Sequence, residues 1–160
     1  MRHAAIGAVC VLSGAMVLGF GCSSPAPSTN SFAHVYSTAI APNCTSPYCH
    51  NNGVSLKWSG LDLSNQVIAY WSLVDHILEG PSCANLVSAR RVVPFHPETS
   101  LLYEKVSQTN PPCGVQMPAD PNALWPSGTT PQAVVFSGTP LTADDQQLIF
   151  NWIKEGGQNN

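Results

Sequence analysis

Residues 44–50 read Cys-Thr-Ser-Pro-Tyr-Cys-His, and this short stretch carries more information about the fold than any other part of the chain. It places two cysteines with four residues between them and a histidine directly after the second. Such a group can close a small disulfide loop, hold a soft metal ion through thiolate and imidazole, or attach a cofactor. The compartment of the protein and the remaining sequence bear on this choice.

The first 21 residues predict an export signal. Arg2 and His3 form a short positive start, and residues 4–20 are an almost uncharged apolar run. Cys22 follows Gly21, which predicts a lipoprotein processing site with Cys22 as the lipid-bearing N-terminus, although Gly19 stands where such sites usually carry Leu. The alternative is ordinary cleavage near the same place, which would release a soluble secreted protein.

Residues 22–30 contain a Ser/Pro-rich tether, and residues 31–160 are expected to form one small domain. Only 9% of the 160 residues are charged, the net charge is −3, and six Lys plus Arg provide no basic stripe for a nucleic acid. No nucleic-acid partner is therefore expected. Residues 120–140 are rich in Pro, Gly, Ser and Thr and are interpreted as a loop insertion.

Apolar spacing predicts four helices joined by loops, an all-α domain. The first helix begins after a Ser31 cap and stops at Pro42. The second helix lies between a Ser64 cap and Gly80-Pro81, and its apolar stripe consists of Val67, Trp71, Val74 and Leu78. The third runs over residues 98–106 with Pro97 in its first turn. The last begins at a Thr142 cap, buries Leu148, Ile149, Trp152 and Ile153, and ends at Gly156-Gly157. Residues 133–136 give the best strand signal.

Four cysteines remain in an oxidising compartment once the export signal and Cys22 are set aside. They are Cys44, Cys49, Cys83 and Cys113. If all four form disulfides, three pairings are possible. The histidine directly after Cys49 adds the further possibility that the first two are not paired at all.

The segment from Cys44 to His50 resembles the haem attachment site of c-type cytochromes, in which two cysteines bind the haem vinyl groups and the adjacent histidine is the proximal iron ligand. The usual site has two residues between the cysteines, and this chain has four. The order of elements is also similar to single-haem cytochrome c domains of bacterial envelope lipoproteins, over about residues 31–156. The resemblance implies a cytochrome c-like fold, one covalent haem c on Cys44 and Cys49, and His50 as an axial ligand.

Met117 stands before Pro118 and is the only methionine of the chain after the export signal. Proline disfavours helical geometry at the preceding residue, so we expect Met117 on an extended loop. The segment resembles the Met-Pro loop that carries the distal sulfur ligand in His/Met cytochromes c. With Cys44 and Cys49 bound to haem, the resemblance implies that Cys83 and Cys113 pair and tether this loop. His96, also on a loop, is the competitor for the distal position.

The sequence shows no catalytic motif, so an enzyme is not expected. The resemblance implies an electron-transfer protein of the cell envelope, anchored to a membrane by the Cys22 lipid and serving redox protein partners there. One alternative is a haem-free structural or binding lipoprotein held by Cys44–Cys49 and Cys83–Cys113 disulfides. A weaker alternative is a copper or zinc site made by Cys44, Cys49, His50 and Met117.

Overall fold

The computed structural model describes residues 30–46, 49–51, 60–78, 83–86, 88–119 and 139–160. Within these ranges the chain is helical and contains no strand, only the isolated bridges Val74–Val92 and Ile77–Arg90. This agrees with the predicted all-α class. The export signal, most of the tether and insertion, and the predicted strand at residues 133–136 lie outside the described residues.

The N-terminal helical segment passes through Pro42 and does not stop there. It consists of α1 (Phe32–Val35), a π-helical turn (Tyr36–Ile40) and α2 (Ala41–Cys44). Ser31 caps its start by accepting from the His34 N–H, as predicted. The predicted end at Pro42 was wrong because a π-helical turn precedes the proline. In this turn the backbone hydrogen bonds reach five residues back, as from the Ala41 N–H to the Tyr36 carbonyl. Proline then falls in the first turn of α2, where its missing N–H costs little.

Helix α4 spans Gln66–Leu73 and buries a different face from the one predicted. Its cap is Asn65, whose side chain accepts from the Ile68 N–H, and its buried residues are Ala69 and Leu73. Val67 and Trp71 are exposed instead. The helix ends at Leu73 because side chains from a distant part of the chain bind the residues around its end.

Two arginines stabilise that turn. Arg91 donates to the Ser72 carbonyl, and Arg90 pairs with Asp75, whose φ of 55° is incompatible with a continuing helix.

The two remaining predicted helices are confirmed. A 3₁₀ turn (Pro97–Thr99) leads into α5 (Leu101–Ser107), and α7 runs over Ala143–Lys154. Thr142 caps α7 by accepting from the Asp145 N–H, and two acidic residues occupy the first turn, where the helix dipole favours them. The chain leaves the end of α7 through Gly156 and Gly157, both at positive φ.

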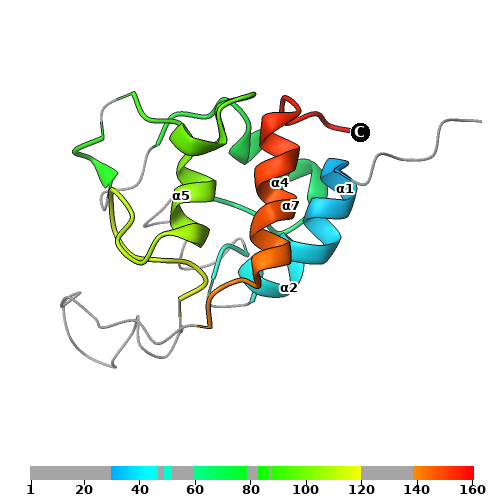
Figure 1. Cartoon of the computed structure of the whole chain (residues 1–160), viewed down its shortest axis with the longest axis horizontal. Coiled ribbons are helices and arrows are strands. Elements are labelled where there is room, and N and C mark those ends of the chain that lie inside the picture. The colour runs from blue at the N-terminus through cyan, green and yellow to red at the C-terminus, as the bar shows by residue number, and fades with distance from the viewer. Residues whose placement is uncertain (1–29, 47–48, 52–59, 79–82, 87, 120–138) are drawn as a thin grey trace, which may run out of the picture.

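Aromatic side chains join the first and last helices. The rings of Phe32 and Trp152 lie 5.0 Å apart between α1 and α7, and those of Tyr103 and Phe150 lie 5.1 Å apart between α5 and α7. Figure 1 shows α7 between α5 on one side and the N-terminal segment on the other. This core fixes both the end of α2 and the loop after α5.

Candidate functional site

The end of α2 places the two cysteines and the histidine in one compact turn. Cys44 is the last residue of α2, and its carbonyl accepts from the His50 N–H at 3.0 Å. The Cys49 N–H donates to the Ser46 carbonyl at 2.9 Å, and the His50 carbonyl accepts from the Leu63 N–H at 2.7 Å. The backbone thus closes on itself across the four-residue gap, so the wide spacing still brings Cys44 and His50 together.

Neither Cys44 nor Cys49 belongs to a disulfide in this structure. Cys44 packs against the hydrophobic core, and burial, with a smaller contribution from Cys49, raises the pKa of its thiol to about 12. The Ser46 hydroxyl donates to the Cys49 sulfur at 2.9 Å. The Cys44 thiol therefore stays protonated at neutral pH.

The surroundings of His50 lower the pKa of its imidazole and so favour the neutral ring. Burial lowers its pKa, a hydrogen bond to the Leu61 carbonyl opposes that shift, and the positive charges of Arg91 and Lys105 lower the pKa further. In the neutral ring, the nitrogen that donates to Leu61 carries the proton and the other keeps its lone pair. A carbonyl partner of this kind fixes ring orientation in metal-ligating histidines.

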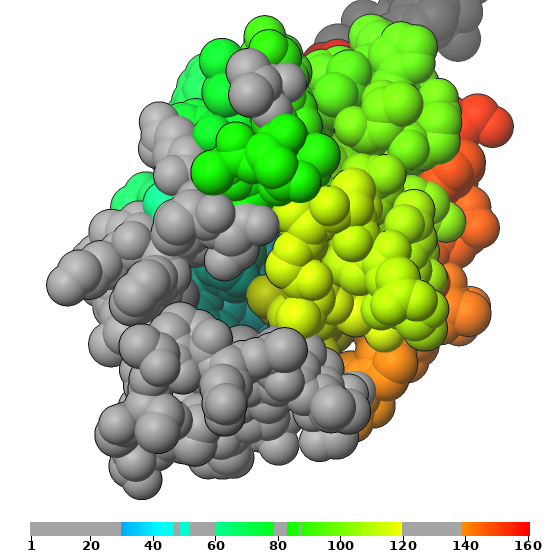
Figure 2. All heavy atoms as spheres, turned by 90° about the vertical axis from the view of Figure 1, so that its left-hand side faces the viewer, coloured from blue at the N-terminus to red at the C-terminus, as the bar shows by residue number. Residues whose placement is uncertain are grey.

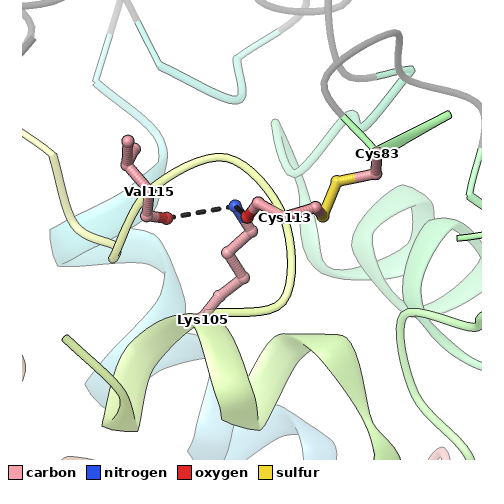
Figure 3. The surroundings of a disulfide bond; sticks show 4 residues. All are labelled: Cys83, Lys105, Cys113 and Val115. Carbon is pink, nitrogen blue, oxygen red and sulfur yellow. Dashed lines mark hydrogen bonds between the residues drawn. A yellow bond between two sulfur atoms is a disulfide. The ribbon is translucent and has the colours of Figure 1, made fainter. Parts of the chain in front are cut away.

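Met117 lies on the loop after α5, as predicted. Its side chain is half-buried against the core, and its N–H donates to the Lys105 carbonyl at 2.7 Å. The Lys105 ammonium reaches back from α5 to the same loop and donates to the carbonyls of Cys113 and, at 3.0 Å, Val115 (Figure 3). Lys105 therefore holds residues 113–117 through both its side chain and its backbone.

The Cys83–Cys113 disulfide that the resemblance implies is present in the structure. The two Cα atoms are 5.1 Å apart, and the bond closes a separation of 30 residues. It joins the segment after α4 to the Met117 loop, beside the Lys105 contacts in Figure 3. The loop is thus fixed on one side by a covalent bond and on the other by an ammonium group.

Figure 2 shows that this face of the molecule is hollowed. Cyan atoms of the N-terminal segment lie deep inside the hollow, and yellow atoms of the loop that carries Met117 form part of its edge. The two segments that provide the candidate ligands therefore meet at the same depression.

Sequence reasoning missed the two cations that act on His50. Arg91 is only 4% exposed and donates to the carbonyls of Ser72 and Gly60. Burial lowers the pKa of Lys105 to about 8. The sequence around Arg91 and Lys105 contains no motif for either role, because the partners of both side chains are backbone carbonyls 8–31 residues away in the chain.

The other described histidines, His34, His76 and His96, contact residues near them in the sequence. His34 is exposed on α1, and its Nδ1 contacts the Thr38 hydroxyl. His76 follows α4 and is not part of it, contrary to the prediction, because the helix ends at Leu73. His96, the competitor for the distal position, is exposed and lies 3.7 Å from the Glu98 carboxylate.

The types of donor present are those that covalent attachment of haem would require. Within the described ranges, no three His, Cys, Asp or Glu side chains converge on a point where a metal ion could sit. The donors of a haem site need not converge on one point. Each thiol would bind its own vinyl group, and only the imidazole and the thioether would bind iron. Cys44, Cys49, His50 and Met117 meet that demand in kind, and Arg91 and Lys105 add positive charge near a site for an anionic porphyrin.

Comparison with protein-family models, with curated proteins and with solved structures finds no match to this chain. Among the described helices, none has both the length and the apolar character needed to cross a membrane.

Proposed function

We propose that this protein is a covalent haem-binding electron-transfer protein of the cell envelope, a c-type cytochrome. Cys44 and Cys49 would hold the haem, and His50 and Met117 would be its axial ligands. The observation that carries the proposal is the 3.0 Å hydrogen bond from the His50 N–H to the Cys44 carbonyl, which brings the two ends of the motif together, with the His50 imidazole hydrogen-bonded to the Leu61 carbonyl.

The bound haem would supply a one-electron couple between ferric and ferrous iron. The residues of this chain would set how that couple behaves. The Leu61 carbonyl orients His50, while Lys105 and the Cys83–Cys113 disulfide hold the loop of Met117. A thioether opposite an imidazole raises the reduction potential relative to two imidazoles. With both axial positions taken by side chains, the protein would pass electrons and not bind substrate at iron.

The partners would be redox proteins of the envelope, met in short encounters that need only a small interface. A lipid on Cys22 would anchor the protein to a membrane through the tether of residues 23–30. The alternative is a haem-free lipoprotein stapled by two disulfides.

Expression with a haem-maturation system followed by visible spectroscopy tests the proposal. We expect a reduced-minus-oxidised spectrum with the sharp bands of a low-spin c-type haem, and its loss in a Cys44→Ala/Cys49→Ala variant. A colourless product from the unaltered chain would contradict the proposal and favour the stapled lipoprotein.

The distal ligand is tested separately with Met117→Ala. This variant should keep covalent haem and lose the near-infrared band that arises from sulfur bonded to ferric iron. His96→Ala is the matched control and should keep that band. Retention of the band in Met117→Ala would remove Met117 from the site.

A further inference from the structure

Helix α4 presents an apolar face to solvent. Val67 is 63% exposed, Trp71 66% and Ile68 39%, and these are three of the five large hydrophobic side chains that are exposed among the described residues. The helix has the sequence Gln-Val-Ile-Ala-Tyr-Trp-Ser-Leu and carries no charged residue. A face of this size, without charge and rich in aromatic surface, favours contact with another apolar phase.

The chain enters the domain beside this helix. The ring of Phe32, the first residue of α1, lies 5.2 Å from the ring of Tyr70, which in turn lies 5.3 Å from the ring of Trp71. Asn30 is held by its side-chain amide, which donates to the Glu155 carboxylate at 2.6 Å. The root of the tether is therefore fixed within two ring contacts of the exposed Trp71.

The tether is too short to let the domain move far from its anchor. Nine residues, Ser23 to Ser31, separate Cys22 from Phe32 at the start of α1, and a Pro-rich chain of nine residues spans about 28 Å. A lipid on Cys22 would therefore keep the root of the tether, and α4 beside it, within one domain diameter of the membrane surface. A second contact made at such short range is strengthened by its high effective concentration.

We propose that the α4 face formed by Val67, Ile68 and Trp71 docks on the phospholipid surface that holds the Cys22 lipid. The inference rests on the lipid anchor proposed above and does not require haem. Tryptophan and aliphatic side chains on one helix face are suited to the boundary between headgroups and acyl chains. The start of α1 lies on the right of Figure 1, whereas the hollow is seen from the left, so docking beside the tether root leaves the hollow open to partners.

The test uses the full mature lipoprotein in phosphatidylethanolamine/phosphatidylglycerol vesicles that contain a photoactivatable phospholipid, with peptide mass mapping after illumination. We expect crosslinks concentrated in residues 66–73. Trp71→Ser combined with Val67→Ser should reduce them at least fivefold, whereas Trp71→Phe should retain them. Ile77→Ser is the matched control, because Ile77 is also exposed but lies outside α4, and it should leave labelling of 66–73 unchanged.

Three results would overturn the proposal. Crosslinks spread evenly over the domain would show no preferred face, and an N-terminal peptide without lipid would remove the anchor. Sedimentation of a Cys22→Ser form as a dimer that Trp71→Ser dissociates would assign the face to a second copy of the chain. The haem spectrum of the same sample reports independently on the proposed electron-transfer function, so the two failures are distinguishable.

Discussion

Removal of the Cys83–Cys113 disulfide should destabilise the domain by a calculable amount. The bond closes a separation of 30 residues. In the chain-entropy treatment, a loop of that length is worth about 3.6 kcal/mol at 25 °C, because the open unfolded chain gains conformational freedom. For a domain of roughly 130 residues, that loss corresponds to a fall in Tm of about 10–15 °C.

The assay is urea unfolding of a Cys83→Ala/Cys113→Ala variant beside the unaltered protein, both expressed and matured in the same way. Cys113 is buried, so its truncation adds a small packing loss of its own. The unaltered protein with this disulfide reduced by dithiothreitol is the control that keeps both sulfur atoms. A loss below about 1 kcal/mol in both forms would refute the reasoning, since opening the bond would then give the unfolded chain little extra conformational freedom.

The same structure yields two further predictions. Lys105→Met keeps the aliphatic stem but removes the hydrogen bonds to the Cys113 and Val115 carbonyls. Urea unfolding should therefore show that the free energy of unfolding falls by about 1–3 kcal/mol. An unchanged midpoint would mean that Lys105 does not hold the loop. In the haem-free protein, iodoacetamide should alkylate Cys44 at pH 8 about 10²–10³ times more slowly than in the urea-unfolded chain. The reason is that only the thiolate reacts, and burial raises the pKa of the Cys44 thiol to about 12. The rate should climb about tenfold for each pH unit up to that value, and a plateau near pH 9 by peptide mass mapping would contradict the pKa.

Local signals predicted the helices whose ends are set locally. The α7 start depends on Thr142 and the acidic first turn beside it, and its end depends on Gly156 and Gly157. All of these act within one helical turn, so the sequence alone was sufficient. The start of α1 at Ser31 was predictable for the same reason.

Long-range contacts explain the errors. Two arginines that lie 15 and 19 residues beyond their partners decide the end of α4: Arg91 donates to the Ser72 carbonyl in its last turn, and Arg90 donates to the Asp75 carbonyl just after it. No local pattern carries that information. Its buried face follows from the ring of Phe32 meeting Tyr70. Helix continuation through Pro42 required a π-helical turn, which the apolar spacing does not reveal.

The candidate site also combines features that are local in the sequence with features that depend on long-range contacts. Cys44, Cys49 and His50 are close in sequence, and their turn was expected to be one unit. The Cys83–Cys113 bond followed from the resemblance and is present in the structure. The roles of Lys105 and Arg91 depend on where loop carbonyls lie after folding, and the sequence contains no motif for them.

The most direct test of the haem proposal is the mass of the purified, fully matured protein, followed by peptide mapping under non-reducing conditions. We expect one haem added to the polypeptide, carried by the peptide that contains Cys44 and Cys49, with Cys83 linked to Cys113. A polypeptide mass without haem, together with a peptide in which Cys44 and Cys49 are joined by a disulfide, would contradict it.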